Sequence, residues 1–104
     1  MTVGQILIVG GYGDVGKRIS AELAPSYPGR VVVAGRTLAS GIEAASAIGF
    51  GTRARLIDTS TASAIGSALD GAEIVISCID LPNRMLLWAA IERGLEYTDI
   101  TPRL

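Results

Sequence analysis

A glycine-rich segment near the start of the chain has the spacing of a phosphate-binding turn. Gly11, Gly13 and Gly16 form a G-x-G-x-x-G pattern between a strand-like apolar run and a helix-like segment, which is the context that gives this pattern meaning. The first glycine permits a tight turn, the second lets a pyrophosphate approach the backbone, and the third lets the helix pack against the strand. The helix N-terminus then offers N–H groups and partial positive charge to the phosphates. The alternative is a turn that serves packing only.

The same segment also fits a second spacing. Gly10, Gly13 and Gly16 form G-x-x-G-x-x-G, which is found in extended short-chain dehydrogenase relatives. Those enzymes usually carry a catalytic Tyr-x-x-x-Lys pair. The only lysine here is Lys17, and no tyrosine stands four residues before a lysine. That catalytic pair is therefore absent.

The residues after the second expected strand predict the choice of cofactor. NAD-binding sheets usually place an acid there, on the ribose 2′-hydroxyl. This chain has Arg36 and Thr37 instead, and Arg36 lies 25 residues after Gly11. An arginine offers a planar fork of donors to a 2′-phosphate. We therefore expect NADP(H) rather than NAD(H), with NAD left possible, unless Arg36 is only a solvated surface residue.

Four further side chains are candidates because ligands lie outside the carboxyl ends of parallel strands. Asp58 would meet the adenine edge or cap the following helix. Cys78, Ile79 and Asp80 end the fourth expected strand, where the nicotinamide ribose would pass. We expect Cys78 to be a small core residue rather than a nucleophile. Asp99 would line the reaction centre or cap a turn. Lys17 would remain in solvent or contact a phosphate.

Strand-like and helix-like segments alternate along the whole chain. We expect strands at Gln5–Val9, Val31–Ala34, Ala54–Ile57, Glu73–Cys78 and Glu96–Ile100. Four helices are expected between them. The first carries Val15, Ile19 and Leu23 on one face, and the second runs from Leu38 to Ile48 with Ile42, Ala45 and Ile48 on one face. The third follows a cap at Thr59, Ser60 or Thr61 and runs through Leu69, and the fourth runs from Pro82 to about Arg93. This order predicts an α/β doubly wound parallel sheet, a Rossmann fold with strand order 3-2-1-4-5 and helices on both faces, forming one domain over residues 1–104.

Composition excludes several classes of protein. The 104 residues include 9 basic and 10 acidic side chains, a single cysteine and no histidine. A Ser-His-Asp triad, an internal disulfide and a cysteine-rich zinc site are therefore excluded, and we expect no metal. Near-neutral charge disfavours nucleic acid as a partner. The single cysteine leads us to expect a reducing, cytoplasmic compartment. No signal peptide or membrane-length apolar run is evident, so we expect no membrane partner.

Several segments together resemble saccharopine dehydrogenase-like proteins. They are residues 6–16, the Ala-Gly-Arg-Thr segment at 34–37 and the segment 90–100 with its Tyr-x-Asp-Ile ending. In that family this region is the N-terminal NAD(P)-binding Rossmann domain, and a larger C-terminal domain binds the substrate. The resemblance implies cofactor contacts at the following positions: Gly11, Tyr12, Gly13, Asp14, Val15, Gly16, Arg36 and Thr37.

The resemblance supplies neither catalytic residues nor a substrate. Because the chain ends at Leu104, just after the fifth expected strand, we expect a fragment of a longer protein that lacks its substrate domain. Met85 to Ile91 are seven consecutive apolar residues that cover every face of a helix. One face would pack on the sheet, and the other, including Trp88, would contact the missing domain or a second copy, unless the whole helix is buried.

The leading hypothesis is the NADP(H)-binding domain of an oxidoreductase that exchanges hydride with nicotinamide C4, inactive as an isolated fragment. A non-catalytic NADP(H)-sensing domain is the alternative from another class, because fold does not fix function. A reductase domain related to short-chain dehydrogenases is a third hypothesis. The intact glycine turn disfavours a vestigial structural domain.

Overall fold

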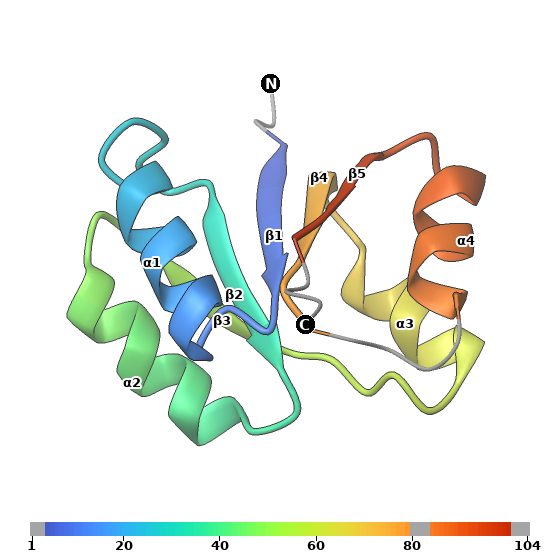
Figure 1. Cartoon of the computed structure of the whole chain (residues 1–104), viewed down its shortest axis with the longest axis horizontal. Helices are drawn as coiled ribbons and strands as arrows, with labels where there is room; N and C mark the ends of the chain where they lie inside the picture. The colour runs from blue at the N-terminus through green and yellow to red at the C-terminus, as the bar shows by residue number, and fades with distance from the viewer. Residues whose placement is uncertain (1–3, 80–83, 101–104) are drawn as a thin grey trace.

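The computed structural model describes residues 4–79 and 84–100. Its five strands form one sheet in the order β3-β2-β1-β4-β5, and all four strand pairings are parallel. Four helices connect the strands, with α1 and α2 on one side of the sheet and α3 and α4 on the other (Figure 1). The expected doubly wound Rossmann fold and its strand order are confirmed.

The observed elements agree with the expected ones to within a few residues at each end. The strands are β1 Gln5–Val9, β2 Val31–Gly35, β3 Arg53–Leu56, β4 Ala72–Ser77 and β5 Glu96–Asp99. The helices are α1 Asp14–Leu23, α2 Leu38–Ile48, α3 Ala62–Ala68 and α4 Met85–Glu92. The expected helix start at Pro82 lies outside the described residues.

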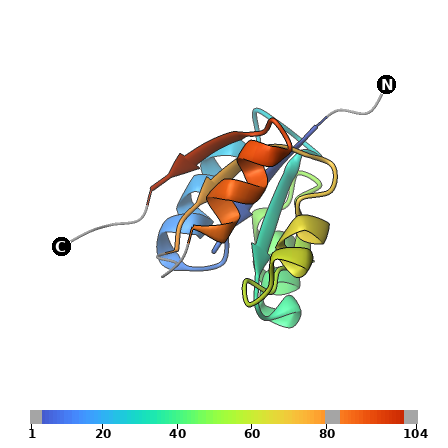
Figure 2. The ribbon, with the colours of Figure 1, turned by 90° about the vertical axis from the view of Figure 1, so that its right-hand side faces the viewer.

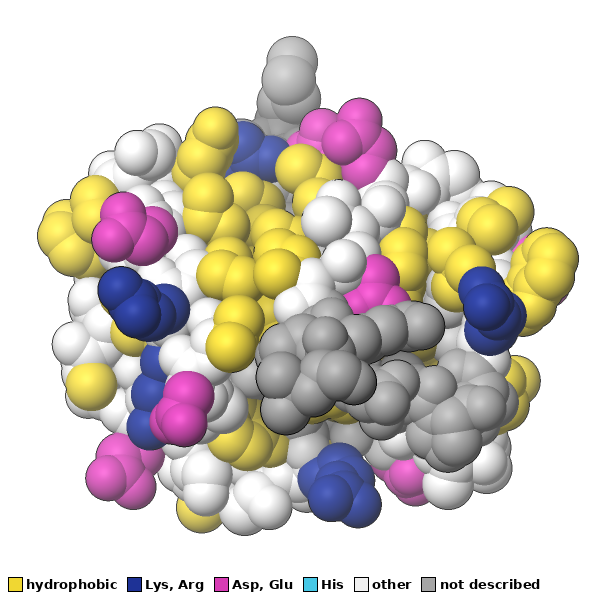
Figure 3. Space-filling model, in the orientation of Figure 1, with side chains coloured by type: hydrophobic (Ala, Val, Ile, Leu, Met, Phe, Trp, Pro, Cys, Tyr) yellow, Lys and Arg dark blue, Asp and Glu magenta, His cyan; other side chains and the backbone are white. Residues whose placement is uncertain are grey.

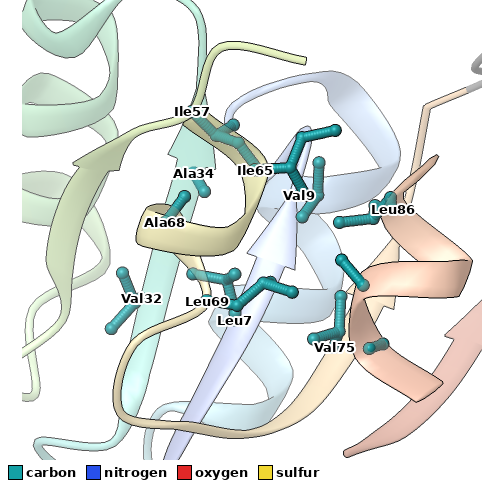
Figure 4. Packing of buried hydrophobic residues seen from close by; sticks show 12 residues of the cluster. Leu7, Val9, Val32, Ala34, Ile57, Ile65, Ala68, Leu69, Val75 and Leu86 are labelled. Atoms are coloured by element: carbon teal, nitrogen blue, oxygen red, sulfur yellow. The ribbon is translucent and has the colours of Figure 1, made fainter. Parts of the chain in front are cut away.

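Both faces of the central strand are buried, as the unbroken apolar run of β1 predicts for a parallel sheet. Leu7 and Val9 point into the core under α3 and α4, which Figure 4 shows with Ile65 and Leu86 packed against them. Ile6 and Ile8 point into a smaller core on the other face, where α1 contributes Ile19 and Leu23. Figure 2 shows α4 running along the sheet beside β5.

Two helices turn most of their predicted apolar face toward the sheet, since Ile19, Leu23 and Ile48 pack against the smaller core, but one residue of each face remains exposed. The buried residues of α1 are Gly16 and Ser20, while Val15 is 37% exposed. In α2 the buried residues are Gly41, Ala44 and Ala45, and Ile42 is exposed. Small residues let a helix backbone approach the sheet closely, so the buried glycine, serine and alanine residues face the sheet together with the larger side chains that pack against this core.

The sequence left open whether helix α4 is wholly buried or has one face free for contact with another domain or copy. Leu86, Ala89 and Ala90 are buried against the sheet, whereas Trp88 is 59% exposed and Ile91 is 54% exposed. The alternative of a wholly buried helix is therefore wrong. The outer face exposes these two large apolar side chains together with Glu92.

The pairing registers place the carboxyl ends of all five strands along one edge of the sheet. Val9 pairs with Ala34 on one side and with Ser77 on the other. Gly35 pairs with Leu56, and Ser77 with Asp99. Every candidate residue that follows a strand and belongs to the described part of the chain therefore lies along this carboxyl edge, at the lower end of the sheet in Figure 1.

Candidate functional site

The turn between β1 and α1 is held by glycine backbone geometry. Gly10 has a φ of +82°, a left-handed conformation that glycine adopts without strain. The Gly13 N–H donates to the Gly10 carbonyl oxygen at 3.0 Å. A Cβ on Gly11 would lie 2.7 Å from Cβ of Val33, and one on Gly16 would collide with the Gly10 carbonyl oxygen. Gly16 therefore has the packing role that the motif predicts, whereas Gly11, which the motif predicts to permit a tight turn, leaves room for the Val33 side chain.

Gly13 differs from the other two because it faces open space. A Cβ there would meet only the Gly10 carbonyl oxygen, at 3.4 Å. Gly13 is the N-cap of α1, and the first intrahelical bond runs from the Lys17 N–H to the Gly13 carbonyl oxygen at 2.8 Å. The N–H groups of Asp14, Val15 and Gly16 precede that bond and are available to an anion. The turn thus provides the open cradle and free donors that a pyrophosphate needs.

Arg36 and Thr37 occupy the neighbouring position at the end of β2. Both are exposed, and Thr37 is the N-cap of α2 without a side-chain capping bond. Within the described part of the chain, the Arg36 guanidinium has no hydrogen bond or ion pair. The Arg36 guanidinium and the Thr37 hydroxyl, which bond to no other described residue, therefore lie beside the glycine turn.

The side chain of Tyr12 connects these two parts of the carboxyl edge. Its phenol oxygen accepts a hydrogen bond from the Thr37 backbone N–H at 2.7 Å. A Cβ on Gly35 would collide with the Tyr12 hydroxyl and ring, and a Cβ on Gly41 would lie 3.3 Å from its Cε1. Sequence reasoning missed this contact. The signal in hindsight is that glycines end β2 and stand in the first turns of α2.

Asp58 lies at the same edge, after β3. One carboxylate oxygen accepts a hydrogen bond from the Ser60 N–H at 2.9 Å, and hydrogen bonds from Ser60 lower the pKa of the Asp58 carboxyl. The cap of α3 is Thr61, whose hydroxyl accepts from the Ala64 N–H at 3.1 Å. The helix-capping alternative for Asp58 is therefore wrong, and its contact with adenine stays a prediction.

Cys78 follows β4 and is half-buried. Its N–H donates to the Val9 carbonyl oxygen at 2.8 Å, which places it directly beside the glycine turn. Burial raises the pKa of the Cys78 thiol, and the Asp99 carboxylate raises it further. A thiol held in its neutral form is a poor nucleophile. The preference for a packing role over a nucleophilic one is consistent with this, while Asp80 lies outside the described residues.

An apolar groove runs along α1 and was not expected from the sequence. It is lined by Val15, Arg18, Ile19, Glu22, Leu23 and Ile100. Hydrophobic side chains gather on this face in the space-filling view of Figure 3. The groove begins at the glycine turn, since Val15 belongs to the motif. It exists because α1 buries its small residues and leaves its larger ones at the side.

No protein-family model matches the chain, and no curated protein matches it. Solved structures do. Saccharopine dehydrogenase (L-Glu forming) from Saccharomyces cerevisiae is 25% identical with a TM-score of 0.82, over 98% of this chain and 22% of that one. An NADPH-dependent quinone oxidoreductase from Escherichia coli is 26% identical with a TM-score of 0.70, over 89% and 34% of the two chains. Triphenylmethane reductase from Citrobacter sp., complexed with NADP(H), is 18% identical with a TM-score of 0.73, over 90% and 36%.

These matches confirm the expected resemblance to saccharopine dehydrogenase and to Rossmann domains of NAD(P)-dependent oxidoreductases. The chain spans about a fifth to about a third of the length of these three proteins. Across residues 4–79 and 84–100, no helix is long and apolar enough to cross a membrane.

Proposed function

We propose that this chain is the NADP(H)-binding domain of an oxidoreductase. The observation that carries the proposal is Arg36, which is exposed at the carboxyl end of β2 and unpaired among the described side chains. An NAD-specific domain places an acid at this point. The strand order brings Arg36 next to the glycine turn, because β2 pairs directly with β1.

The residues of the turn fit the dinucleotide. The open space above Gly13 would take the pyrophosphate, and the free N–H groups of Asp14, Val15 and Gly16 would bind its oxygens. Arg36 and the Thr37 hydroxyl would bind the 2′-phosphate. Asp58 would lie toward the adenine, and Cys78 would line the path toward the nicotinamide. When bound, the cofactor supplies the hydride chemistry, and this chain orients it.

We also propose that substrate binding and catalysis depend on a second domain in a longer protein. The matched regions of the solved oxidoreductases form only a part of those chains. The described residues at the carboxyl edge include no histidine, and the one cysteine there is held neutral. This chain alone should therefore bind dinucleotide without turning over a substrate.

Titration of the wild-type chain and of Arg36→Ala with NADPH and NADH tests the cofactor assignment. Charge-assisted hydrogen bonds contribute roughly 1.5–3 kcal/mol each, so Arg36→Ala should weaken NADPH binding by one to two orders of magnitude and leave NADH binding unchanged. Arg53→Ala is the matched control, because Arg53 is an exposed arginine at the start of β3, away from the carboxyl edge. Equal affinities of the wild type for NADPH and NADH would overturn the proposal.

A further inference from the structure

The Tyr12 side chain has a hydrogen-bonding capacity that the structure uses only in part. A phenol has one O–H donor and two acceptor lone pairs. The oxygen accepts the Thr37 N–H at 2.7 Å. No described residue receives the O–H hydrogen. The half-buried ring thus holds an available donor at a fixed position beside Arg36 and Thr37.

The position of this donor is determined by packing on two sides. The ring lies against Gly35 at the end of β2 and against Gly41 in α2, at positions where any other side chain would press on it. The hydrogen bond from the Thr37 N–H restricts rotation of the phenol O–H about its C–O bond. A donor held in this way loses little conformational entropy when a ligand accepts from it.

Two arrangements are open to a phosphate at this point. It could take the Thr37 N–H for itself, in which case the phenol oxygen competes with the ligand and must move away. Alternatively the phenol keeps the N–H and donates its own hydrogen to the phosphate. The second arrangement breaks no existing hydrogen bond and leaves the ring in its packed position, so it is the one that the contacts favour.

We propose that the Tyr12 hydroxyl is a specificity-determining group that donates a hydrogen bond to the 2′-phosphate of NADP(H) while accepting the Thr37 N–H. This inference rests on the proposed cofactor assignment and assigns a selective role to a side chain of the glycine turn. The ribose 2′-hydroxyl of NAD(H) carries no negative charge, so it gains much less from this donor.

Tyr12→Phe tests the proposal, since it keeps the ring between Gly35 and Gly41 and removes only the hydroxyl. The probes are 2′,5′-ADP and 5′-AMP, which differ by the 2′-phosphate alone. A hydrogen bond to a charged acceptor predicts roughly tenfold weaker binding of 2′,5′-ADP to the variant, with 5′-AMP unchanged. Tyr27→Phe is the matched control, because Tyr27 is a partly exposed tyrosine in the loop that precedes β2.

Unchanged or tighter binding of 2′,5′-ADP to Tyr12→Phe overturns the proposal, and tighter binding would show that the phenol competes with the phosphate. If the variant does not fold, hydrogen exchange of the Thr37 amide in the wild type decides. Its protection should rise with 2′,5′-ADP well above that with 5′-AMP while its proton shows no coupling to the phosphorus of the bound 2′-phosphate, because the phenol oxygen remains its acceptor; equal protection, or such a coupling, overturns the proposal. If the wild type binds 2′,5′-ADP more tightly than 5′-AMP and Tyr12→Phe has the same two affinities as the wild type, only the role of the Tyr12 hydroxyl is refuted. A wild type that binds neither probe nor NADPH refutes the cofactor assignment as well.

Discussion

Gly16 lies so close to Gly10 that a Cβ on Gly16 would collide with the Gly10 carbonyl oxygen. Because that atom belongs to the backbone of the turn, it cannot move aside as a flexible side chain would. Gly16→Ala should therefore destabilise the fold by about 1–3 kcal/mol, as overpacking does. Thermal or denaturant unfolding measures this directly.

Gly13→Ala is the informative partner of that variant. Its Cβ would meet only one atom, at 3.4 Å, and alanine at an N-cap costs about 1 kcal/mol or less relative to glycine. The fold should persist while NADPH binding is lost, because the methyl group occupies the proposed pyrophosphate space. Intact NADPH binding by a folded Gly13→Ala would contradict the placement of the pyrophosphate at this turn.

The sequence predicts the sheet well because its signals are local. Continuous β-branched runs such as Val31–Ala34 mark buried parallel strands, and the glycines that follow them mark the strand ends. The contacts that orient the helices, in contrast, involve residues far apart in the sequence. Val15 and Ile42 follow an amphipathic spacing yet remain exposed, because helix contact with the sheet depends on how closely two backbones approach. That distance is set by the small residues opposite the strands.

The candidate site was predictable in its positions and not in its contacts. Arg36 and the glycine turn follow from a motif with fixed spacing. The bond between Tyr12 and Thr37 joins residues 25 apart in the sequence, and it depends on the absence of a side chain at Gly35. No propensity or periodicity encodes such a pairing, so it requires the folded structure.

Asp14 should oppose the function that its neighbours support. It is an exposed carboxylate in the first turn of α1, where it favours the helix through the macrodipole but lies beside the proposed pyrophosphate. Asp14→Asn should tighten NADPH binding several-fold at low salt and lower the stability by about 0.3–1 kcal/mol. Calorimetric titration at two salt concentrations, paired with unfolding, checks both effects. Weaker NADPH binding would mean that the carboxylate itself contacts the ligand favourably.

The reactivity of Cys78 should depend on pH in a way that reports its surroundings. Burial is the main cause of its raised pKa, and the Asp99 carboxylate adds to it. The midpoint of iodoacetamide alkylation against pH should therefore lie above that of a free thiol. Asp99→Asn should lower the midpoint without bringing it down to the free value, because burial remains. A midpoint that does not move would exclude the electrostatic contribution of Asp99.

The two faces of α4 should respond differently to truncation. Leu86 is 1% exposed on the side of α4 that packs on the sheet, whereas Trp88 is 59% exposed on the outer side. Leu86→Ala should destabilise the chain by about 2–5 kcal/mol, while Trp88→Ala should change the stability by about 0.5 kcal/mol or less. Unfolding of both variants under the same conditions tests this difference.

The same pair of variants addresses whether the outer face of α4 joins two copies of the chain, which remains a prediction. A large exposed indole with the exposed Ile91 three residues further along the same helix is typical of an interface. If copies associate there, sedimentation of the wild type should show a concentration-dependent dimer that Trp88→Ala abolishes while the monomer stays folded. If the wild type remains monomeric at high concentration, the homodimer is excluded. The exposed Trp88 face would then fit contact with another domain, and Trp88→Ala would leave NADPH binding by this chain unchanged.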